Sequence, residues 1–251
     1  MALTGLQIQK LLPKTNCKEC GSNTCLAFAM KLAAKQADLS MCPYASEEAK
    51  SVLGAASEPP VKGIDLGADK NLRIGEETVL YRHEKTFVNQ TLFAVNIDDN
   101  DSPEMIDDTI KNLNEYAIER VGEKLTIELV SLTQKGDNPE RYAALAKKIR
   151  EKTNKPLILN SSDKNSLLLA AEAIKGSNSI LSSANPENTA DLKDIAARFD
   201  HSLAITAETI DELVTLVEKL KAEGFKNLIL NFKTHSLAEL LQINSIARRM
   251  A

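Results

Sequence analysis

All four cysteines of the chain lie near its amino terminus, in the pattern Cys17-x2-Cys20-x4-Cys25-x16-Cys42. Three of them fall within nine residues, and the other 209 residues after Cys42 contain none. Thiols gathered in this way, in a chain without signs of secretion, are typical of a metal or iron–sulfur ligand set rather than of disulfides. The amino-terminal segment must therefore fold around these side chains.

Two kinds of centre fit such a ligand set. Structural zinc sites usually pair two Cys-x2-Cys knuckles, whereas this chain has one knuckle and a distant fourth cysteine followed by proline. Proline directly after a cysteine ligand is typical of ferredoxins, and a glycine between the ligands allows a tight loop whose amides point at sulfur. We therefore expect Cys17, Cys20, Cys25 and Cys42 to bind a [4Fe-4S] cluster, with structural zinc and free thiols as the alternatives.

The composition gives no sign of a nucleic-acid or membrane partner. The 251 residues carry a formal net charge of −4, and the 31 basic residues are dispersed along the chain, so no basic surface for nucleic acid is expected. Tryptophan is absent and aromatic residues make up 4%, too few for a base-stacking platform. No signal peptide and no run of ~18 apolar residues is found. We expect a cytoplasmic protein.

Residues 1–58 are expected to form a helical cluster domain. Apolar spacing predicts a helix over Leu3–Leu12, strong helix formers predict another over Cys25–Lys35, and Ser46 caps a third. Residues 59–90 are then expected to be a linker and a β-hairpin. The linker begins with Pro59-Pro60, which ends any helix and stiffens the connection.

Residues 91–251 are expected to form a parallel (β/α) domain, because six strand-like runs alternate with six amphipathic segments. The expected strands are Thr91–Ile97, Leu125–Leu132, Pro156–Leu159, Ser179–Ser182, Ser202–Thr206 and Asn227–Phe232. The expected helices are Pro103–Ala117, Pro139–Lys152, Asp163–Lys175, Pro186–Phe199, Ala207–Glu223 and Ser236–Met250. Six strands suit an open doubly wound sheet, whereas a closed barrel needs eight. No glycine-rich nucleotide-binding turn follows the first strand.

Polar residues follow several of these strands, namely Asp98, Asp99, Asn100, Asn160 and Asn231. The carboxyl ends of parallel strands are where such folds bind ligands. Asn and Asp also begin loops and cap helices without any ligand, so both interpretations stay open.

No catalytic constellation stands out from the sequence. The three histidines, His83, His201 and His235, are scattered and have no neighbouring His or Cys, so we expect surface or capping roles for them rather than a second metal site. His83 lies beside Glu77–Arg82, the clearest strand of the expected hairpin. No nucleophile and base are paired by their spacing, which suits a carrier or electron-transfer subunit better than an enzyme with a bond-breaking site.

The chain resembles a known family, most specifically around the cysteines. The stretches that carry the resemblance are Leu12-Pro13-Lys14-Thr15-Asn16-Cys17-Lys18-Glu19-Cys20-Gly21, Thr24-Cys25-Leu26-Ala27-Phe28-Ala29, Cys42-Pro43-Tyr44, and Gly75-Glu76-Glu77-Thr78 with Tyr81–Phe87. They are similar to the large (gamma) subunit of the corrinoid iron–sulfur protein of the acetyl-CoA decarbonylase/synthase system. The resemblance continues, more weakly, to the end of the chain.

The resemblance implies a methyl carrier in one-carbon metabolism. In that family an iron–sulfur domain, a (β/α)8 TIM barrel and a cobalamin-binding domain make up the large subunit, which pairs with a small (delta) subunit. The cobalt of the corrinoid takes a methyl group from a methyl-tetrahydropterin methyltransferase to acetyl-CoA synthase/CO dehydrogenase, and the cluster returns Co(II) to Co(I). Cys17, Cys20, Cys25 and Cys42 would be the cluster ligands.

Against that family, residues 91–251 provide six of the eight barrel units, and no cobalamin-binding domain follows them. We therefore expect a TIM-barrel-like domain that is truncated, and a corrinoid held mostly by other polypeptide. The alternative is a general electron-transfer protein, in which the same cluster domain is joined to an α/β docking scaffold.

Overall fold

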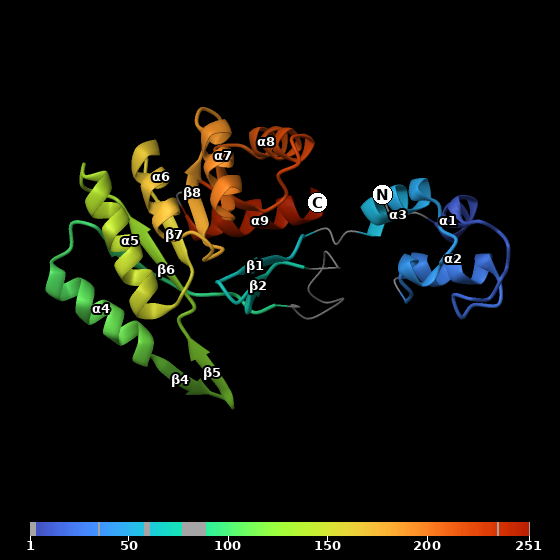
Figure 1. Cartoon of the computed structure of the whole chain (residues 1–251), viewed down its shortest axis with the longest axis horizontal. Coiled ribbons are helices and arrows are strands. Elements are labelled where there is room, and N and C mark those ends of the chain that lie inside the picture. Colours follow the sequence, from blue (N-terminus) through green and yellow to red (C-terminus); the bar gives the residue numbers. More distant parts are fainter. Residues whose placement is uncertain (1–3, 35, 58–60, 77–88, 235, 251) are drawn as a thin grey trace. The chain divides into compact units, whose positions relative to one another are not determined.

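The structure, a computed structural model, describes residues 4–34, 36–57, 61–76, 89–234 and 236–250. The chain divides into two compact units, residues 1–60 and 61–251, and Figure 1 labels most of their helices and strands. The expected Pro59-Pro60 linker, the strand Glu77–Arg82, His83 and His235 lie outside the described residues. No helix in the described ranges is both long and apolar enough to cross a bilayer.

The first unit is a small set of helices around its own apolar core. Its elements are α1 (Gly5–Leu11), α2 (Cys25–Ala33), the short 3-10 helix η1 (Leu39–Met41) and α3 (Glu47–Ser57). α1 begins in a capping box, in which the side chains of Thr4 and Gln7 bind each other's backbone amides. The core residues are Ile8, Leu12, Phe28, Ala29, Ala45, Ala49 and Leu53 together with three of the cysteines. The three predicted helices are confirmed.

The second unit contains a parallel six-stranded sheet with the strand order β10-β9-β8-β7-β6-β3. The strands are β3 (Ala94–Asp98), β6 (Leu129–Thr133), β7 (Leu157–Asn160), β8 (Ile180–Ala184), β9 (Ser202–Ala207) and β10 (Leu228–Phe232). Each strand therefore pairs with its neighbour in the chain order, without the reversal that defines a doubly wound sheet. This order is the one found in a TIM barrel, and the predicted fold class is confirmed.

The helices of this unit cover one face of the sheet. They are α4 (Pro103–Glu115), α5 (Pro139–Thr153), α6 (Lys164–Ala173), α7 (Thr189–Phe199), α8 (Ile210–Ala222) and α9 (Leu237–Met250). Their apolar faces meet alternate strand residues such as Val130 and Leu132 in the main core. Because successive strand residues point to opposite faces, Leu129 points the other way, into a separate cluster.

A short hairpin packs on that second face of the sheet. β1 (Ile64–Leu66) pairs antiparallel with β2 (Leu72–Ile74), and Ile64 and Leu66 are buried together with Leu129, Ile180 and Ala204. Leu129 and Ile180 are the first residues of their strands, so the hairpin covers the amino ends of the strands. The inner face is therefore apolar at that end.

A second hairpin corrects the sequence-based assignment of one strand. The run Leu125–Leu132 was expected to be a single strand, but its first two residues belong to β5 (Glu123–Thr126), which pairs antiparallel with β4 (Ala117–Arg120). The turn residues Val121 and Gly122 both have positive φ, 53° and 81°, as a tight type I′ hairpin requires. The hairpin extends away from the sheet in Figure 1. A β-propensity run alone does not show where one strand ends and the next begins.

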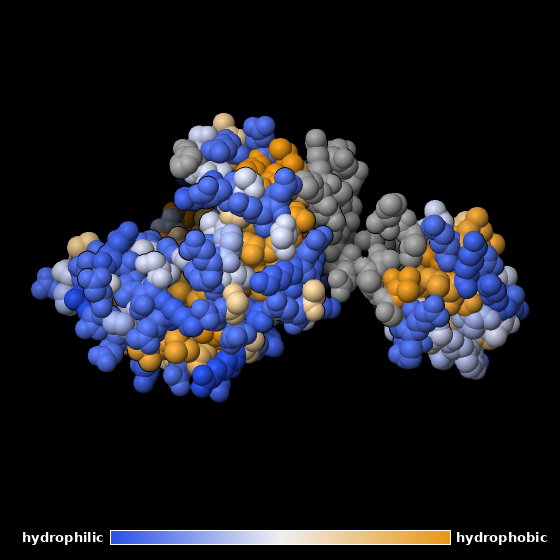
Figure 2. Space-filling model, turned by 90° about the horizontal axis from the view of Figure 1, so that it is seen from above, coloured by the Kyte–Doolittle hydropathy of each residue, from blue (hydrophilic) through white to orange (hydrophobic). Residues whose placement is uncertain are grey.

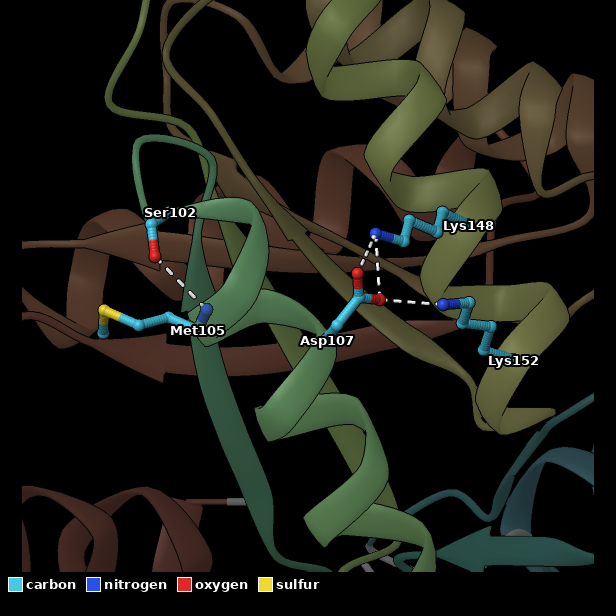
Figure 3. Close-up of polar contacts among 5 residues, drawn as sticks. All are labelled: Ser102, Met105, Asp107, Lys148 and Lys152. Atoms are coloured by element: carbon cyan, nitrogen blue, oxygen red, sulfur yellow. Dashed lines mark hydrogen bonds and ion pairs between the residues drawn. The ribbon is translucent and has the colours of Figure 1, made fainter.

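An exposed ion-pair cluster joins the first two helices of the sheet domain. The carboxylate of Asp107 on α4 accepts hydrogen bonds from Lys148 Nζ at 3.0 Å and Lys152 Nζ at 2.7 Å, both on α5 (Figure 3). The hydrogen bonds from Lys152 and Lys148 lower the pKa of Asp107. Ser102 caps the start of α4, and its hydroxyl accepts the amide of Met105 at 3.2 Å. Since these charged groups are exposed to solvent, the ion pairs between α4 and α5 contribute little to the free energy of unfolding.

His201 is buried, which corrects the surface or capping role expected for it. It is 2% exposed, its Nδ1 accepts the amide of Ser179 at 3.2 Å, and its Nε2 lies 3.0 Å from the carbonyl oxygen of Ala171. Because Nδ1 accepts, Nε2 carries the proton of the neutral ring. Burial lowers the pKa of His201. The sequence shows only that this residue precedes a strand, not that α6 and the start of β8 close over it.

The neutral state of His201 predicts a loss of stability in acid. Because folding lowers the pKa of this base, the unfolded protein takes up a proton more readily than the folded protein. The free energy of unfolding is therefore unaffected above the unfolded-state pKa of about 6.5, and below it falls by at most about 1.4 kcal/mol per pH unit. Urea unfolding followed by circular dichroism between pH 7.5 and 5.0 should show that the free energy of unfolding decreases as the pH falls. In His201→Gln this decrease with pH should be less steep. Equal slopes in the two proteins would rule out His201 as the titrating group.

Candidate metal centre

The four cysteines lie on the loop and helix starts of the first unit. Cys17 and Cys20 are in the loop after α1, Cys25 is the first residue of α2, and Cys42 follows η1. None of the four forms a disulfide. Cys20, Cys25 and Cys42 are buried in one cluster, whereas Cys17 is exposed.

Two side-chain contacts hold the cysteine segments together. The side-chain oxygen of Asn16 accepts the backbone amide of Cys25 at 2.8 Å, which ties the residue before Cys17 to the start of α2. The hydroxyl of Tyr44 donates to the carboxylate of Glu19 at 3.0 Å, which joins the segment after Cys42 to the Cys17–Cys20 knuckle. This hydrogen bond to Glu19 raises the pKa of Tyr44. Neither contact was expected from the sequence, since the two residues that each contact joins are nine and 25 positions apart.

The backbone of the cysteine loop adopts an unusual series of conformations. Lys14, Asn16, Lys18 and Gly21 all have φ between 49° and 73°, in the left-handed region. Left-handed residues that alternate with ordinary ones form concavities lined by backbone N–H groups, which bind phosphates and iron–sulfur centres. A negatively charged centre suits such a loop.

The types and order of the donor residues bear on which centre fits. Four thiolates can bind one zinc ion in a tetrahedral site or the irons of a cubane. Structural zinc sites usually pair two Cys-x2-Cys knuckles, whereas this segment has one knuckle and a proline directly after its fourth cysteine, as ferredoxins do. The donor set therefore fits a cluster better than a single zinc ion.

One polar atom in this loop has no hydrogen-bond partner in the part of the chain that the structure describes. Ser22 is 5% exposed, and its Oγ is a buried side-chain atom without a hydrogen bond among the described residues. By contrast, Thr24 Oγ1 accepts the amide of Ala27 at 3.0 Å and caps α2. Leaving a buried hydroxyl unpaired costs roughly 1–3 kcal/mol. Ser22 is thus an orphaned donor between Cys20 and Cys25, a second indication that a further group belongs here.

The polar residues predicted at the strand ends lie at one edge of the sheet, where several of them bind neighbouring polar side chains. Asn231 donates to Thr206 at 3.2 Å, and Asn160 accepts from Ser183. Asp98 accepts from Asn96, and Asn100 is exposed. Neighbouring side chains of the polypeptide therefore engage Asn231, Asn160 and Asp98.

Asp99 has a structural role at the same edge. Its carboxylate accepts the amides of Lys135 and Gly136 at 2.6 and 3.0 Å. The loop it holds borders an open pocket of about 440 Å³ between the starts of α5 and α6.

These features together define a class of protein: a four-cysteine helical module joined to a singly wound parallel α/β domain of the TIM-barrel type. A family model described as "CO dehydrogenase/acetyl-CoA synthase delta subunit" matches residues 60–250, and the chain belongs to this family. A second model, described as "Putative Fe-S cluster", matches residues 12–44, which include all four cysteines.

Similar proteins carry names from the same system. The chain is 35% identical to the corrinoid/iron-sulfur protein large subunit of Moorella thermoacetica, with 98% of the chain and 56% of that protein covered. It is 29% identical to the acetyl-CoA decarbonylase/synthase complex subunit gamma of Methanothermobacter thermautotrophicus (100% and 56% covered) and 30% identical to that of Methanocaldococcus jannaschii (99% and 53% covered). The resemblance inferred from sequence is confirmed. The chain spans about half the length of these relatives.

Proposed function

We propose that Cys17, Cys20, Cys25 and Cys42 hold a [4Fe-4S] cluster, and that the chain is the iron–sulfur part of a corrinoid methyl carrier. The observation that carries the proposal is the four-thiol loop, with its alternating left-handed residues, inside a chain similar to corrinoid/iron-sulfur proteins. When bound, a cluster of this type accepts and releases one electron. In the proposed role that electron restores Co(I) from Co(II) during methyl transfer from a methyl-tetrahydropterin to acetyl-CoA synthase.

Each part of the first unit would have a defined task. The four thiolates ligate the irons, and Asn16 and the Tyr44–Glu19 pair keep the cysteine segments in position. The loop amides favour a negatively charged centre. The small unit also exposes apolar side chains, including Leu6, Met30, Met41 and Tyr44, and Figure 2 shows apolar surface on it. Such a surface suits docking onto redox partners.

The proposal extends to the organisation of the chain and to its partners. The cluster domain comprises residues 1–58, residues 59–90 provide the linker and a β-hairpin, and residues 91–251 form the barrel-type domain. The proposed partners are the small (delta) subunit, the methyltransferase and acetyl-CoA synthase/CO dehydrogenase, because relatives are named as subunits of that complex. The corrinoid would be held mostly by other polypeptide.

Four free cysteines fit a reducing compartment, and we place the protein in the cytoplasm.

Electron transfer to cobalt tests this function. The full chain, the delta subunit and Co(II) cobalamin are combined without oxygen, a low-potential reductant is added, and Co(I) is followed by its absorbance. We expect the wild-type chain to speed Co(I) formation at least about tenfold over Cys25→Ala, which lacks a cluster ligand. Equal rates with the two proteins would contradict the proposed electron transfer to cobalt, whereas the proposed cluster is tested separately by its iron content.

A further inference from the structure

The orphaned hydroxyl of Ser22 lies where a cluster would need donors. Ser22 is two residues after Cys20 and three before Cys25, and both cysteines belong to the buried cluster of the first unit. Its Oγ is enclosed yet has no partner among the described residues. Two polar side chains of the same loop have other partners, because Asn16 binds the amide of Cys25 and Thr24 caps α2.

A buried hydroxyl is rarely left without a partner in a native protein. Since none of the described residues is a partner of Ser22, the hydroxyl is available to a water molecule or to the group that the cysteines bind. Sulfur atoms of an iron–sulfur centre accept hydrogen bonds, and such bonds are among the factors that set its reduction potential.

We propose that the Ser22 hydroxyl donates a hydrogen bond to a sulfur atom of the cluster and thereby raises its reduction potential. This inference rests on the proposed [4Fe-4S] centre. On reduction the centre gains one electron from an external donor while Ser22 keeps its proton, and no bond of the serine breaks. Because the added charge spreads onto the sulfurs, a donor aimed at one of them stabilises the reduced state more than the oxidised state.

The test compares reduction potentials in the full chain. Ser22→Ala removes the hydroxyl, and Ser40→Ala is the matched control, since Ser40 is an exposed serine two residues before Cys42. In an anaerobic titration monitored by EPR, Ser22→Ala should shift the potential to more negative values. The expected change in the reduction equilibrium is up to about tenfold, which for one electron corresponds to about 59 mV. Ser40→Ala should not move the potential.

Iron and sulfide analysis of each sample separates the outcomes. If wild-type protein contains no iron, the proposed function fails and this inference fails with it. If Ser22→Ala keeps its iron and its wild-type potential, the serine contacts water or nothing, and only this inference is overturned. If the alanine variant loses its cluster, Ser22→Thr is measured in its place, because threonine retains a side-chain hydroxyl. Iron retained in the threonine variant alone would support the hydrogen bond, and iron lost from both would contradict it.

Discussion

Replacing Cys25 by alanine is expected to reduce the iron content of the protein from about four atoms per chain to less than one tenth of that value. Alanine is a strong helix former, and the amide of residue 25 would still donate to Asn16, so α2 keeps its start. The substitution therefore removes one thiolate with little other change. Iron and acid-labile sulfide, measured after anaerobic purification, report the loss.

A core substitution in the same unit provides the control. Leu53 on α3 is 3% exposed and packs in the same apolar cluster as the cysteines, but it has no ligand atom. Leu53→Ala is expected to lower the thermal midpoint while the folded protein keeps its iron. An unchanged iron content in Cys25→Ala would show that Cys25 is not a ligand.

Replacing Asp99 by alanine is expected to lower the free energy of unfolding of the second unit by about 3 kcal/mol, because hydrogen bonds to an ionised group contribute roughly 1.5–3 kcal/mol each. Asp99 is 1% exposed, and its carboxylate accepts the amides of Lys135 and Gly136. The variant would leave both amides without this acceptor. Urea unfolding followed by circular dichroism measures the change.

Two variants check the origin of this effect. Asp99→Asn keeps one acceptor oxygen and should lose about half as much stability, while Asp108→Ala removes an exposed carboxylate of α4 and should change stability by less than about 0.5 kcal/mol. If Asp99→Ala were as stable as Asp108→Ala, the loop would not depend on this carboxylate.

The sequence predicted the elements of the sheet domain well because each signal was local. Pro103 and Pro139 stand at the first position of α4 and α5, behind the caps Ser102 and Asn138, as their fixed φ favours. Pro186 is also a proline, but it does not stand at the first position of a helix. It lies in a turn in which Asn185 binds the amides of Glu187 and Asn188, so the helix expected from Pro186 begins only at Thr189.

The features that were missed depend on contacts distant in the sequence. His201 is buried because α6 and the segment before β8 meet at its ring, and Asp99 has its role because the loop after β6 folds onto it. For the metal centre, the spacing of the cysteines was enough to propose all four ligands. The burial of Ser22 could not be inferred from the sequence, since serine in a loop is usually exposed.

Analysis of the metal content of anaerobically purified wild-type protein, together with its EPR spectrum after reduction by dithionite, is the most direct test of the cluster assignment. We predict about four iron and four sulfide per chain and an S = 1/2 signal from the reduced centre. A colourless protein that contains one zinc ion per chain and gives no such signal would contradict the account.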